Sequence, residues 1–81
     1  MAIFEVESPL PGAYYRKPAP DQPPYVEVGD VVEAGQTLGL IEIMKQYTPL
    51  EAEVAGTVKE FLVEDAGMVE AGSIVLTIET E

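Results

Sequence analysis

The sequence contains no cysteine and no histidine, and only 4 of its 81 residues are lysine or arginine. The first two absences exclude disulfide bridges, zinc sites with thiolate or imidazole ligands, cysteine nucleophiles and histidine general bases. With 15 acidic residues the formal net charge is -11, which repels nucleic acids and anionic membrane surfaces. We therefore expect neither a nucleic acid nor a membrane as a partner.

Long apolar runs are also missing, and none approaches the roughly 20 residues that cross a bilayer. The first residues show no basic stretch and no apolar run of the kind found in targeting peptides, so the expected location is the cytoplasm. A hydrophobic share of 47% over 81 residues is typical of one folded domain with a modest core. We expect a single domain over residues 1–81.

Candidates for catalysis are few. Ser8 and Ser73 could act as nucleophiles, but neither lies in a Gly-x-Ser-x-Gly elbow. The carboxylates that could act as acid and base are dispersed beside turns and read as solvated surface: Glu27, Glu33, Glu64 and Glu70. We expect no catalytic residue and no metal ligand, with a small enzyme built on these carboxylates as an open alternative.

Short β-type runs separated by glycine and proline dominate the chain, and no stretch keeps a helical period. In the last run Ile74, Leu76 and Ile78 share one face, while the residues between them share the other. The pattern predicts an all-β fold, either a sandwich of two small antiparallel sheets or a flattened β-barrel. The expected strands cover residues 3–7, 13–16, 25–28, 37–43, 47–54, 57–64 and 74–80.

An internal repeat divides the chain into two like halves. Residues 26–35 align with 63–72 at an offset of 37, whereas residues 11–13 resemble 55–57 at an offset of 44. The first half therefore holds seven extra residues, near 18–24. Two halves that are each too small to bury an apolar face should pack with two-fold quasi-symmetry. Gly35 and Gly72 are expected to supply the positive φ of equivalent tight turns.

The first half continues past its match with the second, through residues 43–46, so Lys45 falls at a hairpin between the halves. Such a tip usually carries Asn-Gly or another glycine-bearing pair, and Met44-Lys45 is a weak turn former. Departures from local rules of this kind are typical of functional sites. On these residues alone, an ordinary surface lysine remains the alternative interpretation.

Residues 42–46 resemble the attachment motif of the biotinyl domain family, Ala-Met-Lys-Met preceded by glutamate, in which Ile43 and Gln46 replace the usual alanine and methionine. Residues 8–12 and 51–58 are similar to the family's opening strand and to its passage into the second half. The resemblance thus covers almost the whole chain. The related lipoyl domains place aspartate before the lysine and alanine after it, so the motif favours biotin over lipoate.

The extra segment of the first half adds to the resemblance. Residues 15–21, followed by 25–30, look like the protruding thumb of the carriers of bacterial-type acetyl-CoA carboxylases, here an insertion near 17–24. The resemblance implies a loop that leans over the hairpin and touches biotin, with its prolines limiting its freedom. The candidate contacts are Pro20, Asp21 and Gln22. A passive proline-rich surface loop is the alternative.

What the resemblance implies is a carrier of covalent biotin rather than an enzyme. A biotin protein ligase would join biotin to Lys45, a biotin carboxylase would load it, and a carboxyltransferase would pass the carboxyl group to an acceptor such as acetyl-CoA, for fatty acid biosynthesis. Two further readings remain open, a lipoyl-type acyl carrier and an unmodified interaction module of the same fold. The implied attachment hairpin consists of Glu42, Ile43, Met44, Lys45 and Gln46.

Overall fold

The structure, a computed structural model of the chain, describes residues 2–80 and consists of short strands joined by turns and loops. Among these residues no helix is long and apolar enough to cross a membrane. The strands, numbered in chain order, are β1 (Ala2–Glu7), β2 (Gly12–Tyr15), β3 (Val31–Val32), β4 (Thr37–Ile43), β5 (Gln46–Glu51), β6 (Gly56–Phe61), β7 (Gly67–Val69) and β8 (Ile74–Thr80).

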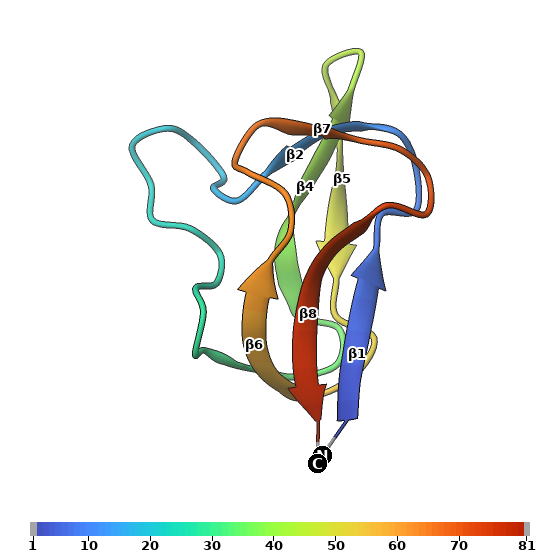
Figure 1. The fold of residues 1–81 in the computed structure, drawn as a ribbon. Coiled ribbons are helices and arrows are strands. Elements are labelled where there is room, and N and C mark those ends of the chain that lie inside the picture. Colours follow the sequence, from blue (N-terminus) through green and yellow to red (C-terminus); the bar gives the residue numbers. More distant parts are fainter. Residues whose placement is uncertain (1, 81) are drawn as a thin grey trace.

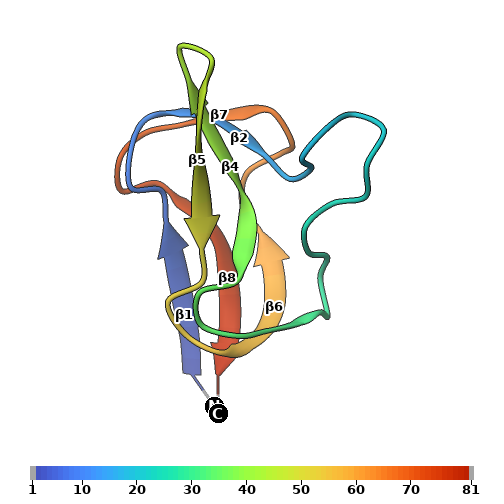
Figure 2. The same cartoon turned by 180° about the vertical axis from the view of Figure 1, so that it is seen from behind.

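The strands form two four-stranded sheets, one in the order β1-β8-β6-β3 and the other in the order β5-β4-β2-β7. All pairings are antiparallel. Replacing each strand of the first sheet by its counterpart in the other half of the chain gives the order of the second sheet. The two sheets face each other, and the β4–β5 hairpin projects beyond them at one end (Figures 1 and 2). The expected flattened β-barrel with two-fold quasi-symmetry is confirmed.

The turns after β3 and β7 repeat the symmetry in their backbone hydrogen bonds. Gly35 N–H donates to the Ala52 carbonyl at 2.7 Å, and Gly72 N–H donates to the Ser8 carbonyl at 2.9 Å. Both glycines have a φ of 90°, which confirms the positive φ expected for them. Each turn therefore ties one half of the chain to the other half.

The core fills the space between the sheets and receives side chains from all eight strands and from two loops. Alternation along β8 is less simple than the sequence indicates, because Val75 (0% exposed) and Thr77 (5%) are also buried. Val75 lies at a β-bulge, between the pairs that Leu76 forms with Val6 and Ile74 forms with Glu7, and it joins the core. A central strand lies between two neighbours, which shield its outward side chains as well. The buried apolar side chains are Val6, Tyr14, Val26, Val32, Leu38, Ile41, Leu50, Ala52, Val58, Val69, Val75, Leu76 and Ile78.

The strand expected at residues 25–28 is wrong. Tyr25 N–H donates to the Arg16 carbonyl, and Asp30 N–H donates to the Glu27 carbonyl in a turn. Val26 is buried, so this apolar stretch packs into the core from a loop and pairs with no sheet. The strands expected at 47–54 and 57–64 end earlier, at Glu51 and Phe61, and the short β3 and β7 were not expected at all.

Candidate functional site

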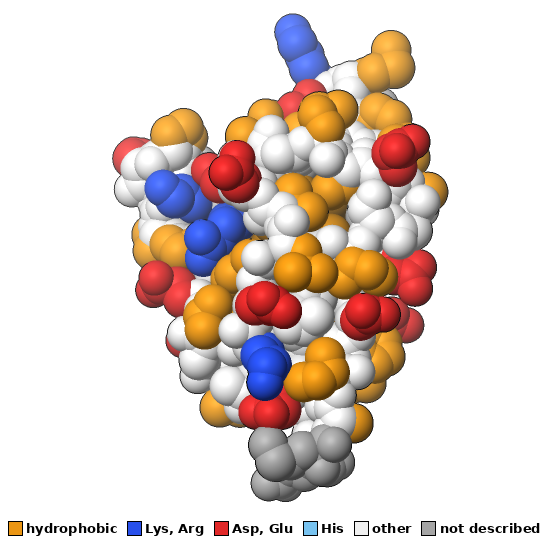
Figure 3. All heavy atoms as spheres, viewed as in Figure 1, with side chains coloured by type: hydrophobic (Ala, Val, Ile, Leu, Met, Phe, Trp, Pro, Cys, Tyr) orange, Lys and Arg blue, Asp and Glu red, His pale blue; other side chains and the backbone are white. Residues whose placement is uncertain are grey.

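Lys45 lies at the exposed apex of the β4–β5 hairpin. Ile43 and Gln46 form the last pair of the ladder, and the two residues between them have positive φ, 50° for Met44 and 64° for Lys45. Positive φ at both central positions is the pattern of a type I′ turn, which costs a residue with a side chain roughly 1–2 kcal/mol. Met44 is 90% exposed, and basic atoms project at this end of the molecule in Figure 3.

Glu42 links this turn to the neighbouring strand. Its Oε2 accepts a hydrogen bond of 3.1 Å from the backbone N–H of Lys45. Its Oε1 accepts a hydrogen bond of 3.2 Å from the hydroxyl of Tyr15 on β2. The hydrogen bond and the negative charge of Glu42 raise the pKa of Tyr15. One carboxylate therefore bridges the β4–β5 turn and β2.

An aromatic surface lies next to Glu42 on the outer face of the β5-β4-β2-β7 sheet. Tyr15 pairs with Leu40, and Tyr47 pairs with Glu42, so these side chains project to the same side. The rings of Tyr15 and Tyr47 have their centroids 6.4 Å apart and are tilted by 51°. Tyr15, Leu40 and Tyr47 together form a largely apolar surface close to the hairpin, called the aromatic wall below.

The thumb-like segment is anchored at Arg16. The backbone N–H of Arg16 donates to Asp65 Oδ1 at 2.8 Å. The Arg16 carbonyl accepts the N–H of Tyr25 at 2.8 Å, which closes the loop. The Arg16 guanidinium lies 4.0 Å from the centroid of the Phe61 ring, a cation–π contact. The segment between β2 and β3 projects from the side of the molecule (Figure 1) on this fixed base.

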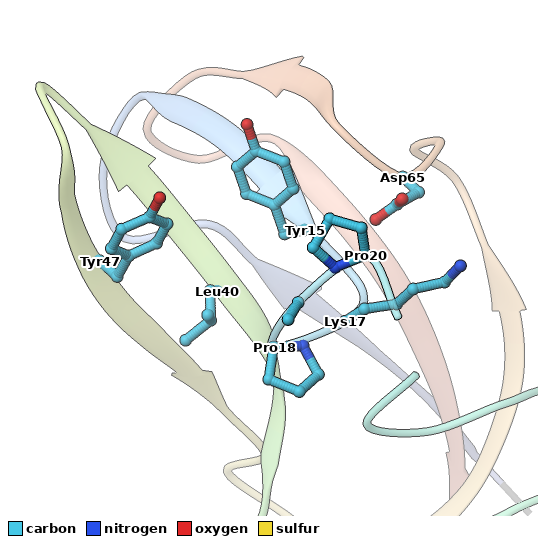
Figure 4. A pocket seen from close by; sticks show the side chains of 8 residues that line it. Tyr15, Lys17, Pro18, Pro20, Leu40, Tyr47 and Asp65 are labelled. Carbon is cyan, nitrogen blue, oxygen red and sulfur yellow. The ribbon is translucent and has the colours of Figure 1, made fainter. Parts of the chain in front are cut away.

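A pocket of about 390 Å³ opens between the thumb-like segment and the aromatic wall. The sheet supplies Tyr15, Leu40 and Tyr47, and the loop supplies the residues from Lys17 to Pro20, with Asp65 at the side. In Figure 4 the two tyrosine hydroxyls point in the same direction, whereas the Lys17 amine points away from both rings.

Of the expected thumb contacts, only Pro20 lines this pocket. Asp21 and Gln22 are exposed at the tip, where the N–H of Gln22 donates to the Ala19 carbonyl in a turn. The structure brings Glu42 and Lys45 together through a hydrogen bond and leaves Ile43, Met44 and Gln46 exposed around them.

Sequence reasoning missed the wall and the base of the thumb. Period-two alternation in β2, β4 and β5 could have placed Tyr15, Leu40 and Tyr47 on one outward face, once the register was known. No local signal connects Asp65 to Arg16, which lies 49 positions away. The dispersed carboxylates do not converge, and within residues 2–80 no group of three or more metal-binding side chains occurs.

Known proteins with similar sequences point to one family. Residues 4–78 match the family described as "Biotin-requiring enzyme". The chain belongs to this family. Its similarity to biotinyl domains, stated from residues 42–46 and the surrounding segments, is thereby confirmed.

Two relatives illustrate the range of the family. The chain is 43% identical over 79 residues, or 98% of its length, to "Biotin carboxyl carrier protein of acetyl-CoA carboxylase" of Nostoc sp., of which it covers 43%. It is 48% identical over 60 residues, or 74% of its length, to "Biotin carboxyl carrier protein of acetyl-CoA carboxylase 2, chloroplastic" of Arabidopsis thaliana, of which it covers 24%. The chain thus spans less than half the length of these relatives.

Solved structures show the same fold. The urea carboxylase of Kluyveromyces lactis superposes with a TM-score of 0.78 at 32% identity, over 98% of this chain and 6% of that protein. The matched portion is therefore a small part of a much larger chain. The same type of domain occurs both in short carrier proteins and within long carboxylases.

Proposed function

We propose that this chain is the carrier domain of a biotin-dependent carboxylase and holds biotin as an amide on Lys45. The observation that supports this most strongly is the position of Lys45, exposed at the apex of the hairpin between the two halves. Relatives that match over most of the chain are named biotin carboxyl carrier proteins of acetyl-CoA carboxylase. Acetyl-CoA carboxylase is therefore the parent enzyme that we propose.

The residues around Lys45 fit such a group. A pocket of about 390 Å³ lies within the range of roughly 300–1,000 Å³ that is usual for small-molecule sites. Its wall of Tyr15, Leu40 and Tyr47 suits an apolar bicyclic ring, and Pro18 and Pro20 limit the freedom of the opposite side. We propose that the domain covers residues 1–81 with a thumb near 17–24, in which Pro20 contacts the ring and Asp21 and Gln22 lie at its rim.

The chain's own contribution is to present and tether. A lysine at this apex can enter the active site of a biotin protein ligase, because the hairpin projects beyond the two sheets (Figure 1). Bound biotin would supply a ring nitrogen that accepts and releases a carboxyl group. Tethering raises its local concentration at the biotin carboxylase and carboxyltransferase sites to roughly the millimolar range without tight binding. The chain itself needs no catalytic residue for this role, and its net charge of -11 disfavours nucleic acids and anionic membranes as partners.

The test is incubation of the chain with a biotin ligase, ATP and biotin, read by intact mass and by avidin binding. We expect a single added biotin, with labelling abolished in Lys45→Arg and unchanged in Lys59→Arg. Lys59 is the matched control because it is also an exposed lysine in the β-structure, on β6. Arginine keeps the charge and occupies an exposed site, so both variants should fold normally.

Three results contradict the proposal. Continued labelling of Lys45→Arg would place the attachment elsewhere. Absence of labelling in the wild-type chain, with lipoate accepted by a lipoate ligase, would identify a lipoyl-type carrier. Absence of both modifications would make the domain an unmodified interaction module.

A further inference from the structure

The attachment turn, formed by Met44 and Lys45, has a backbone conformation that is unfavourable for these two residue types. Met44 and Lys45 both adopt the left-handed conformation that glycine or asparagine normally supplies. Neither side chain stabilises the turn by packing, since both residues are exposed at the tip. The turn must therefore be held by contacts from outside its two central residues.

Glu42 provides such a contact, because its Oε2 accepts the N–H of Lys45 at 3.1 Å. A glutamate side chain has three rotatable bonds, and a half-buried carboxylate at a sheet surface would otherwise move among several rotamers. Its second oxygen, Oε1, is occupied by the Tyr15 hydroxyl at 3.2 Å. The Tyr15 ring packs in turn against the Tyr47 ring, with the two centroids 6.4 Å apart.

We propose that Tyr15 is a positioning residue for Lys45: its hydroxyl fixes the Glu42 carboxylate so that this carboxylate holds the attachment turn in the conformation that a ligase acylates. The inference rests on the proposed function for its enzymatic consequence. The structural part, a relay from the Tyr15 hydroxyl through Glu42 to the backbone of Lys45, stands on hydrogen bonds alone.

The second half of the chain shows the same position without an attachment site. Glu79 lies 37 residues after Glu42, and Lys59 lies 44 residues after Tyr15, at the offsets of the repeat. There the partner of the glutamate is an ammonium, with Lys59 Nζ 3.7 Å from Glu79 Oε2. An ammonium attracts the whole carboxylate by its charge and so competes with a backbone N–H for both oxygens. A neutral hydroxyl donates one hydrogen bond to one oxygen and leaves the other free to accept the backbone N–H of Lys45. Tyrosine at position 15 also avoids a second primary amine beside the turn.

The variant that tests the relay is Tyr15→Phe, with Tyr25→Phe as its matched control. Tyr25 does not line the pocket, and among the described residues its hydroxyl makes no hydrogen bond. Each variant removes one oxygen and keeps the ring, so the tilted pair of Tyr15 and Tyr47 is preserved in both.

The direct measurement is amide NMR of Lys45 in the unmodified chain. In the wild type we expect the hydrogen bond to Glu42 to shift the amide proton of Lys45 downfield and to slow its hydrogen exchange. Tyr15→Phe should reduce this downfield shift and speed exchange at Lys45 by about threefold to tenfold, and Tyr25→Phe should change neither. Unchanged shift and exchange in Tyr15→Phe would overturn the relay.

The functional measurement is the steady-state kinetics of the biotin ligase with each chain as substrate. We expect Tyr15→Phe to lower kcat/KM by about threefold to tenfold at an unchanged melting temperature. In a Glu42→Ala background the same substitution should have no further effect, because Tyr15 acts only through Glu42. An additive loss, or an equal loss in Tyr25→Phe, would overturn the proposal. If the wild type is not biotinylated at all, the proposed function fails, whereas the NMR arm still decides whether the relay exists.

Discussion

The two sheets share a core design but differ on their outer faces. On the β5-β4-β2-β7 sheet the outer face carries Leu40 and Tyr47, and on the other sheet the repeat places Thr77 and Ile3 at the corresponding positions. Acidic side chains are spread over the face of the β1-β8-β6-β3 sheet, which is turned to the viewer in Figure 3. The inner faces remain equivalent, because both are needed to close one apolar core.

The comparison shows where a duplicated scaffold can acquire chemistry without loss of folding. The thumb-like insertion, the two-residue turn and the aromatic wall all belong to the first half or to its junction with the second. None of them contributes the main core contacts apart from Val26, which packs from the loop after the thumb. Side chains that point outward from the first half can therefore differ from those of the second half and form the site, because the shared core depends on the side chains that point inward.

The largest expected effect on stability comes from the glycines that begin β2 and β6. A Cβ at Gly12 would lie 2.4 Å from the Glu42 carbonyl oxygen, and one at Gly56 would lie 2.4 Å from the Glu79 carbonyl oxygen. We expect Gly12→Ala and Gly56→Ala each to lower the free energy of unfolding by about 1–3 kcal/mol, measured by urea denaturation.

Ligase labelling separates the two glycine variants. Gly12→Ala should also reduce labelling of the folded fraction, because it displaces the backbone of Glu42, whereas Gly56→Ala should not. A large stability loss at one position with none at the other would contradict the equivalence of the inner faces.

A smaller effect is expected at Tyr14, whose counterpart in the second half is the equally buried Val58. The Tyr14 hydroxyl donates to the Leu38 carbonyl at 3.1 Å, and burial raises the pKa of Tyr14 well above its ordinary value. In the unfolded chain tyrosine loses its proton near pH 10, while the folded chain retains it, so stability is full below about pH 10 and falls as the pH rises further.

Tyr14→Phe should cost about 1 kcal/mol at pH 7, from the lost hydrogen bond, and should flatten the decline above pH 10. Denaturant unfolding at pH 7 and above pH 10 measures both effects, with Tyr47→Phe as an exposed control. Some decline should persist, because the pKa of Tyr15 is also raised. A decline as steep as that of the wild type would show that Tyr14 does not cause it.

The smallest effect concerns the turns that precede β3 and β7. Ala66 has a φ of 66°, and Gly29, its counterpart at the offset of the repeat, has a φ of 96°. Their N–H groups donate to the equivalent carbonyls of Tyr14 and Val58. We expect Ala66→Gly to stabilise the fold by about 0.5–1 kcal/mol, because glycine adopts this conformation without strain. A thermal melt measures the change, and a lowered melting temperature would contradict it.

The parts that the sequence predicted well are those with a strong pattern. The β-type runs at 37–43 and 74–80 identified β4 and β8, and the repeat placed Lys45 between the halves. Residues 25–28 were misassigned because an apolar run does not distinguish a strand from a loop that buries one side chain, here Val26. The strands β3 and β7 are too short for any period to appear.

For the candidate site, the sequence predicted the hairpin residues but not the contacts that hold them. A known motif marked Lys45 and Glu42, but the hydrogen bond from Tyr15 joins residues 27 positions apart. Such a contact depends on strand register, which the residues of one strand alone do not determine. The contact between Arg16 and Asp65 is more distant still, at 49 positions.

The two ends of the described chain lie together, since Ala2 pairs with Thr80, at the end of the molecule opposite to the hairpin (Figure 1). The longest dimension of the molecule is 38 Å. Any polypeptide joined to either end would thus hold the domain by one pole and leave the lysine at the other. A small change in angle at such a joint would move the lysine along an arc whose radius is nearly the whole length of the domain.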